Sequence, residues 1–265
     1  QYAEEGVGMF RYVYSHSTQN SWQILHEALE TLTQRLHRPT RFTPPEGAFD
    51  DYYREKVEKN LAELRQSRVL RALCAPEYLT VNGTRVRNLP LLMPLLEKER
   101  LREVFSEDSA CEIHGDLTLE NIICYTEGAH TPPYYLIDPN PSTSFRTSCM
   151  ELAKLFQSLH GRYEFLEQGS VLTRGDGSIE FLFPESRQYQ ALLERLCAWI
   201  RETYGERGLR SVFYHEIIHW LRLMPYRLRR NEASAARYYA AMLLVMNDIY
   251  DRYEEPADEK TTGDL

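Results

Sequence analysis

One stretch of the sequence places polar side chains that could do chemistry among aliphatic residues. The stretch CEIHGDLTLENIICY contains His114, Asp116 and Asn121, and a second aspartate, Asp138, follows the apolar run YYLI. One carboxylate can orient or deprotonate an attacking hydroxyl group. An amide oxygen and a second carboxylate can hold Mg²⁺, which prefers hard oxygen ligands. Phosphoryl transfer from ATP to a hydroxyl requires these groups.

The order of these residues matches the order in which kinase catalytic loops supply them. Asn121 lies five positions after Asp116, as in Asp-x-x-x-x-Asn, and the second carboxylate follows a hairpin. Between Asn121 and Asp138 the sequence predicts a strand, a turn at Glu127-Gly128 and another strand. This hairpin would return Asp138 beside Asn121, so the aliphatic residues are predicted to be strands that aim the polar groups at one point.

The elements that must position these groups are mostly helices. Apolar residues at spacings of three and four predict helical stretches at 22–36, 49–74, 89–105, 150–161, 187–204, 209–224 and 232–253. Short strands are predicted at residues 9–14, at CEIHGD, at NIICY and at residues 134–139. The Asn-Gly pair in LTVNGTRV predicts a hairpin, and a second hairpin is expected around Asp176-Gly177. The predicted fold class is therefore α+β.

The stretch IHGDLTLENII, followed by YLIDP, resembles the aminoglycoside phosphotransferase and choline kinase family, whose fold is protein-kinase-like. The resemblance implies that Asp116 is the catalytic base and that His114 supports the loop. It also implies that Asn121 and Asp138 hold Mg²⁺ on ATP. Two departures are visible, IDPNP in place of Ile-Asp-aromatic and Glu151 in place of the aspartate of Asp-Leu-Ala, and neither removes a catalytic group.

The resemblance is confined to the C-terminal lobe of that fold. Residues 15–253 are expected to form this mostly helical lobe with small β-hairpins, residues 1–14 the hinge or last strand of a largely absent N-terminal lobe, and residues 254–265 a flexible tail. The upstream sequence offers no glycine-rich loop with a strand lysine, since helical stretches contain Lys56, Lys59 and Lys98. The chain alone is therefore expected to bind ATP weakly, and an exposed apolar hinge region is expected to favour association.

The implied function is ATP-dependent phosphorylation of a hydroxyl group on a small molecule, with Mg²⁺ and ATP as cofactors. A sugar, an aminoglycoside or an amino alcohol are the candidate acceptors, and the motif does not distinguish among them. The alternative is a catalytically incompetent kinase-like module that binds a ligand or a partner. A glycine-rich loop and a strand lysine in sequence upstream of this chain would favour the enzyme.

A second motif offers a different chemistry. His215, Glu216 and His219 form HEIIH, which matches the H-E-x-x-H pattern of zinc peptidases. Both histidines would be ligands, Glu216 would be the base, and Glu232 is the nearest downstream candidate for a third ligand. The apolar stripe of this helix faces away from both histidines, which predicts that they lie on its outer side or line a cleft. A zinc peptidase is the minor alternative.

Composition narrows the classes of partner. The net charge is −8 and no basic stripe is present, which disfavours nucleic acid. No apolar run approaches the roughly 18 residues that a membrane span requires. The five cysteines are widely spaced without a C-x-x-C pair, which predicts reduced thiols and a cytoplasmic location. Because the chain begins with Gln1, it is expected to be a processed product or part of a longer protein.

Overall fold

The computed structural model describes residues 6–38, 42–125, 130–167, 171–173, 177–231 and 234–254. Within these ranges the chain is α+β and mostly helical, with two small sheets, as the sequence predicts. The chain divides into two compact units. Unit 1 comprises Gln1–Tyr52, Phe105–Glu167 and Phe183–Glu216, and unit 2 comprises Tyr53–Val104, Gln168–Leu182 and Ile217–Leu265.

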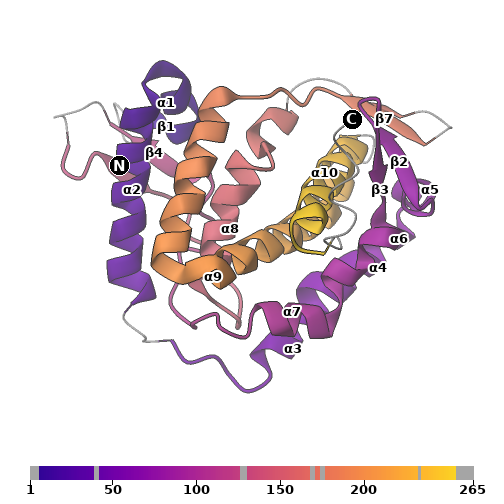
Figure 1. Cartoon of the computed structure of the whole chain (residues 1–265), viewed down its shortest axis with the longest axis horizontal. Coiled ribbons are helices and arrows are strands. Elements are labelled where there is room, and N and C mark those ends of the chain that lie inside the picture. The colour runs from indigo at the N-terminus through magenta and orange to yellow at the C-terminus, as the bar shows by residue number, and fades with distance from the viewer. Residues whose placement is uncertain are drawn as a thin grey trace. The chain divides into compact units, whose positions relative to one another are not determined.

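Unit 1 combines helices with a three-stranded antiparallel sheet (Figure 1). Its sheet has the order β1 (Val7–Gly8), β4 (Ile122–Cys124), β5 (Tyr134–Leu136). Its helical elements are α1 (Met9–Ser15), α2 (Thr18–Leu32), the π-helical turn η1 (Thr33–His37), α3 (Ala48–Tyr53), the short turns η4 (Leu119–Asn121) and η5 (Tyr163–Glu167), α8 (Ser148–Leu159) and the first part of α9 (Arg187–Arg230).

The predicted strand at residues 9–14 is wrong, because this segment forms α1. Met9, Tyr12 and Val13 recur at helical spacing and are all buried, so the segment packs as one face of a helix. Their burial also limits the expected apolar hinge surface, since Tyr14 is the large apolar side chain of α1 that is exposed. Association through this region stays a prediction.

The predicted strand at CEIHGD is also wrong. Ala110 forms only an isolated bridge with Thr147, and the backbone N–H of Cys111 donates to the carbonyl of Arg146. The stretch runs as an extended loop, because its hydrogen bonds go to single residues rather than to a neighbouring strand. The strand predicted at NIICY is confirmed as β4, and the strand predicted at residues 134–139 is confirmed as β5, which ends earlier, at Leu136. The two strands pair antiparallel.

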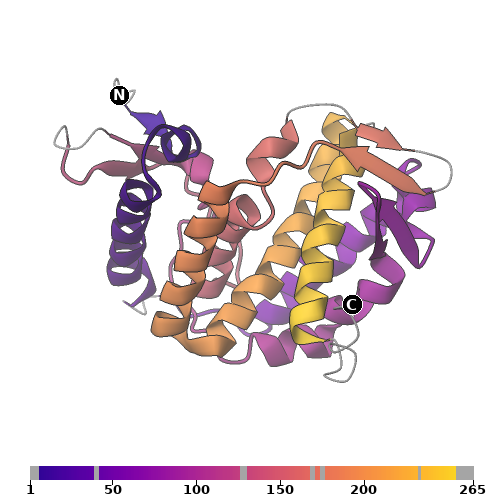
Figure 2. The same ribbon diagram turned by 45° about the horizontal axis from the view of Figure 1, so that its top comes forward.

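Unit 2 combines short helices with a four-stranded sheet of order β3 (Thr84–Arg87), β2 (Tyr78–Val81), β7 (Ser178–Phe181), β6 (Val171–Thr173). Its helical elements are η2 (Arg54–Glu58), α4 (Lys59–Gln66), α5 (Leu70–Cys74), α6 (Leu89–Leu92), η3 (Met93–Leu96), α7 (Lys98–Val104), the second part of α9 and α10 (Ala235–Tyr253). Figure 2 shows α10 beside the second part of α9.

Both predicted hairpins of unit 2 are confirmed. Asn82 and Gly83 join β2 to β3 with φ values of 48° and 84°, the left-handed conformation that a two-residue type I′ turn requires. The strands β6 and β7 pair antiparallel, and β7 also pairs parallel with β2. The predicted turn residue Asp176 lies outside the described residues, as do the Glu127-Gly128 turn, Glu232 and residues 255–265.

The predicted helical stretches are confirmed where the structure describes them, with differences in their division. The stretch 49–74 is interrupted between Gln66 and Leu70, and the stretch 89–105 is interrupted at Glu97. The stretches 187–204 and 209–224 belong to one element, α9, with a kink at Gly205, where φ is 73° and ψ is 178°. Glycine tolerates this conformation because it has no Cβ. In the described part of the chain, no helix is both long enough and apolar enough to cross a membrane.

Candidate active site

His114, Asp116 and Asn121 lie close together in one loop of unit 1, and the backbone at Gly115 shapes that loop. Gly115 has a φ of +86°, and a Cβ added there would collide with the backbone carbonyl of Asn140. The N–H of Asn140 donates to the carbonyl of His114 at 2.7 Å, which holds the two segments in contact. Glycine fits this position because it tolerates both the positive φ and the close approach.

The carboxylate of Asp116 is contacted at both of its oxygens. Nδ2 of Asn121 donates to Oδ2 of Asp116 at 3.2 Å and to the backbone carbonyl of Asp116 at 2.7 Å. Nζ of Lys154 lies 3.1 Å from Oδ1 of Asp116. The Asp116 side chain is 36% exposed, so solvent and small molecules can reach it. An ion pair at this exposure contributes little to stability, about 1 kcal/mol or less.

The predicted return of Asp138 to Asn121 is confirmed at the level of the backbone. Ile122 pairs with Leu136 in the β4–β5 ladder, and the N–H of Ile137 donates to the carbonyl of Asn121 at 3.0 Å. Asp138 is the next residue, with a φ of 55°. The two strands therefore bring the ends of the polar loop and of the hairpin to the same place.

The donor atoms that remain at this place fit a hard divalent cation. Asn121 forms its side-chain hydrogen bonds through Nδ2, which leaves Oδ1 as an acceptor. Asp138 is exposed, and its carboxylate has no hydrogen bond or ion pair with the rest of the described chain. Two protein oxygens suffice for Mg²⁺, which usually keeps several waters and takes further ligands from phosphates.

Glu151 holds the backbone of the loop, and sequence reasoning assigned it no role. Its carboxylate is fully buried on α8 and accepts hydrogen bonds from the N–H of His114 at 2.6 Å and of Gly115 at 2.8 Å. Nε2 of His37 lies 3.4 Å from the same carboxylate. The available signal was the glutamate of ELAKL, at the position where the resembling family has aspartate.

Lys154 is the second residue that sequence reasoning missed. Thr147 caps α8 by accepting from the N–H of Met150 at 3.1 Å, which fixes where the helix begins. Residues three apart on a helix share a face, so Lys154 points toward the loop with Glu151. A lysine within an amphipathic helix gives no sequence signal of this kind, because charged residues on helices are usually solvated.

His114 lies inside the loop rather than at its surface. It is 6% exposed, and its Nδ1 accepts from the N–H of Asp116 at 3.4 Å. Its Nε2 is buried and has no hydrogen-bond partner among the described residues. This position fits support of the loop better than proton transfer to a substrate, and its role stays a prediction.

A chain of buried hydrogen bonds links the loop to the start of α9. The N–H of Leu119 donates to Oγ of Ser158 at 3.2 Å, and Ser158 donates to Glu164 at 2.6 Å. The hydroxyl of Tyr189 donates to the other oxygen of Glu164 at 3.1 Å. Burial raises the pKa of Glu164 to about 7, and the two hydroxyl donors offset only part of that shift.

The HEIIH residues of unit 1 are engaged in the core. Nε2 of His215 lies 2.9 Å from Oδ2 of Asp108, and its ring stacks on Phe105 with centroids 3.8 Å apart. Oε2 of Glu216 lies 2.8 Å from Nδ1 of His160. His215 and Glu216 are fully buried and His219 is 3% exposed, so the predicted location of the two histidines on the outer side of the helix is wrong.

This arrangement does not fit a zinc site. His219, in unit 2, is 3% exposed, and its Nδ1 lies 3.3 Å from the guanidinium of Arg222. Among the residues that the structure describes, no group of three or more His, Cys, Asp or Glu side chains could hold a metal ion. The helix is buried on all sides over residues 211–221, and the polar side chains of His215 and Glu216 are paired with other protein groups.

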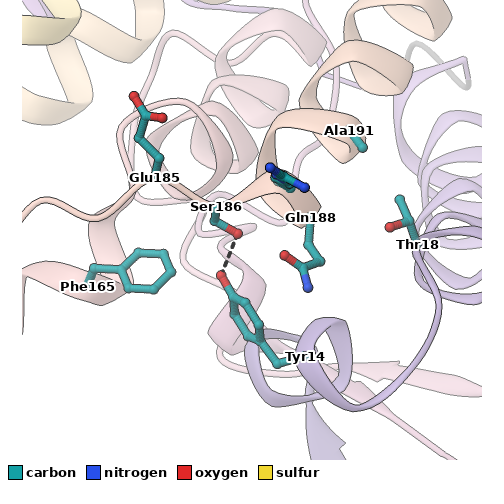
Figure 3. Close-up of a pocket in the computed structure, with 8 residues that line it drawn as sticks. Tyr14, Thr18, Phe165, Glu185, Ser186, Gln188 and Ala191 are labelled. Atoms are coloured by element: carbon teal, nitrogen blue, oxygen red, sulfur yellow. Dashed lines mark hydrogen bonds between the residues drawn. The ribbon is translucent and has the colours of Figure 1, made fainter.

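Unit 1 also contains an open pocket of about 650 Å³ where α9 begins (Figure 3). Tyr14 points toward Ser186, and their hydroxyl oxygens are 2.7 Å apart. The pocket is lined by Tyr14, Thr18, Phe165, Glu185, Ser186, Arg187, Gln188 and Ala191. None of the predicted catalytic or metal-binding residues is in this lining, so the pocket is a feature separate from the polar loop.

Comparison of this chain with protein-family models, with curated proteins and with solved structures finds no match. A proposal for its function therefore depends on the sequence motif and on the geometry of unit 1.

Proposed function

We propose that this chain contains the kinase-like C-terminal lobe of a phosphotransferase that moves a phosphoryl group from Mg²⁺-ATP to a hydroxyl of a small molecule. The acceptor would be a sugar, an aminoglycoside or an amino alcohol. The observation that supports this most is the contact of Asp116 with Asn121 at 3.2 Å, in a loop that leads directly into β4. β4 pairs with β5, the strand that ends two residues before Asp138.

The polar side chains in and around the loop have separate roles in the proposed reaction. Asp116 would accept a hydrogen bond from the acceptor hydroxyl and take its proton, since a carboxylate oxygen has acceptor capacity beyond one contact. Asn121 and Asp138 would hold Mg²⁺, which supplies charge neutralisation on the phosphates when it is bound. Glu151 keeps the N–H groups of the loop fixed, so Asp116 is held in place before a substrate arrives.

Lys154 adds a cation beside the proposed base. Its ammonium group is 3.1 Å from Asp116 and only 16% exposed, so water screens it less than a surface lysine. Catalysis of phosphoryl transfer is mostly positioning and charge stabilisation, and a fixed cation beside the attacking oxygen suits that demand.

A second candidate is a kinase-like module that binds a ligand without turnover. One feature of the sequence favours this binding module, because residues 1–265 contain no glycine-rich loop followed by a strand lysine. The two candidates predict different outcomes for the full-length protein. The enzyme transfers phosphate to an acceptor, whereas the module binds nucleotide or ligand and leaves both unchanged.

The direct experiment is calorimetric titration of this chain with ATP, with and without Mg²⁺. We expect weak binding that requires Mg²⁺ and that is lost in Asp138→Asn. Glu185→Gln is the matched control, because it removes an exposed carboxylate of the same unit that lines the pocket at the start of α9. Binding that is indifferent to Mg²⁺, or equally strong in Asp138→Asn and Glu185→Gln, would contradict the proposal. Transfer of labelled phosphate to a panel of hydroxyl acceptors by the full-length protein then distinguishes the two candidates.

A further inference from the structure

The open pocket at the start of α9 has an aromatic side that the core holds in place (Figure 3). The rings of Tyr14 and Phe165 line it, with centroids 6.2 Å apart and planes at 83° to each other. Both rings pack on the ring of Tyr189, with centroid distances of 6.1 Å and 5.3 Å. Tyr189 is 1% exposed, and its hydroxyl donates to the buried carboxylate of Glu164. The aromatic side of the pocket is therefore formed before a ligand arrives, which lowers the cost of binding.

The rest of the lining is mostly polar, and its side chains keep their hydrogen-bonding capacity. Four of them have no hydrogen bond or ion pair with other described residues, namely Thr18, Glu185, Arg187 and Gln188. A guanidinium supplies donors, a carboxylate supplies acceptors, and a hydroxyl or an amide supplies both. The pocket therefore offers donors and acceptors together, beside two aromatic rings.

The charges within the lining balance. Glu185 contributes one negative charge and Arg187 one positive charge, and the other lining residues are neutral. A lining with no net charge attracts neither an anion nor a cation over the other. A neutral ligand that is rich in hydrogen-bonding groups fits these side chains best.

We propose that this pocket binds a neutral sugar ring, either as a monosaccharide or as one unit of an oligosaccharide. A pyranose has a face of C–H groups that can lie on an aromatic ring, and its hydroxyl groups both donate and accept hydrogen bonds. The volume of about 650 Å³ lies within the range of roughly 300–1,000 Å³ that is usual for small-molecule sites. The lining excludes Asp116, Asn121 and Asp138, so the site does not depend on the proposed phosphoryl transfer.

The test is titration of this chain with D-glucose, D-galactose, D-mannose and N-acetyl-D-glucosamine, measured by saturation-transfer NMR on the sugar protons. We expect saturable binding of at least one of them in the millimolar range. The protons of one ring face should receive the most saturation, because that face lies on the aromatic side of the pocket. Sorbitol is the control ligand, since it carries the same kind of hydroxyl groups on an open chain. It should bind at least about tenfold more weakly, because a flexible chain loses more freedom on binding.

Variants of two lining residues test the two kinds of contact. Tyr14→Leu should weaken binding about three- to tenfold, the scale of one aromatic contact. Tyr14→Phe is its matched control, since it keeps the ring, removes only the hydroxyl and should change the affinity less than about twofold. Gln188→Leu should weaken binding about threefold or more, the scale of one neutral hydrogen bond. Gln23→Leu is its control, because it makes the same change at an exposed position of α2 outside the lining.

Several outcomes would overturn the site. They are binding of none of the four sugars, equal affinity for sorbitol, and equal losses in Tyr14→Leu and Tyr14→Phe. Loss of sugar binding in Asp116→Asn would place the sugar at the polar loop instead, whereas unchanged sugar binding beside a failed ATP titration would leave this site standing without the proposed function. Tyr14 is 44% exposed, so we expect its variants to fold. If circular dichroism shows that Tyr14→Leu does not, Gln188→Leu against Gln23→Leu decides.

Discussion

The polar loop around Asp116 and the HEIIH segment of α9 place similar residue types in very different surroundings. Asp116 is 36% exposed, and the carboxylate of Asp138 beside the loop is open to solvent. His215 and Glu216 are fully buried, and each lies within 3 Å of an ionisable partner. A motif can bind a metal or a substrate only where its polar atoms keep free acceptor capacity, and the loop meets this condition where the helix does not.

The two regions also differ in the contacts that stabilise their structure. Backbone N–H groups bonded to Glu151 fix the loop, and the carboxylate of Asp116 takes no part in these bonds. In the helix the motif side chains are themselves the structural contacts, since they join α9 to Asp108 and His160. Substitutions should therefore affect ligand binding and turnover in the loop, and stability in the helix.

The largest expected effect is on the helix. Glu216→Ala should lower the free energy of unfolding by about 3–5 kcal/mol, because it removes one partner of a buried pair and leaves His160 without it. Glu206→Ala is the control, since Glu206 is 72% exposed in its pair with Arg201 and should contribute at most about 1 kcal/mol. Urea unfolding measures both. A loss below about 1 kcal/mol in Glu216→Ala would remove the contrast between helix and loop.

The next effect concerns Glu164, a buried carboxylate that is connected to the loop. Its folded pKa of about 7 is above the ordinary value of 4.5, so the folded state binds this proton more tightly than the unfolded state. The tighter proton binding therefore stabilises the folded state fully below about pH 4.5. This stabilisation, on the order of 3 kcal/mol in the free energy of unfolding, is lost as the pH rises through about 7.

Urea unfolding of the parent and of Glu164→Gln at pH 4.5, 6 and 8 checks this sign. We expect the parent to lose stability across this window relative to the variant, because the glutamine amide does not ionise. Parallel pH profiles of the two proteins would show that Glu164 titrates normally and that burial does not protect its proton.

The third effect is on turnover. If this protein carries out the proposed transfer, Asp116→Asn should lower its kcat at least about 10²-fold, the usual contribution of a positioned general base. Nucleotide affinity should change little, because the proposed metal ligands are Asn121 and Asp138. Steady-state rates and calorimetry measure the two quantities separately. Normal turnover by Asp116→Asn would contradict the role of this residue.

The smallest effect concerns the backbone of the loop. Gly115→Ala should cost more stability than Gly47→Ala, by about 1–2 kcal/mol. Both glycines have positive φ, which penalises alanine equally, but only at Gly115 would the new Cβ meet the backbone of Asn140. Thermal unfolding of both variants gives the difference. Equal losses would indicate that the loop moves away from Asn140 without cost.

Local patterns predicted most of the elements, and they were wrong where contacts with distant parts of the chain decided the structure. The stretch CEIHGD has no neighbouring strand to pair with among the described residues, so it forms a loop. The Asn82-Gly83 hairpin and the β4–β5 hairpin depend on turn chemistry and on short apolar runs, which are local. The six residues MFRYVY fit both a strand and a helix by their spacing. The burial of Met9, Tyr12 and Val13 on one face selects the helix, and that burial depends on neighbours far away in the sequence.

The sequence by itself determined that Asp116, Asn121 and Asp138 come together. Asp116 and Asn121 are five positions apart in one loop, and a single local hairpin returns the chain from Asn121 to Asp138. It did not determine that Glu151 and Lys154 join them, since a helix that begins thirty-odd residues later reaches the loop only through long-range packing. It also did not distinguish HEIIH from a metal site. Whether a polar side chain is a ligand or a core contact depends on which partners fill its hydrogen-bonding capacity, and those partners, Asp108 and His160, are brought to α9 only by the fold.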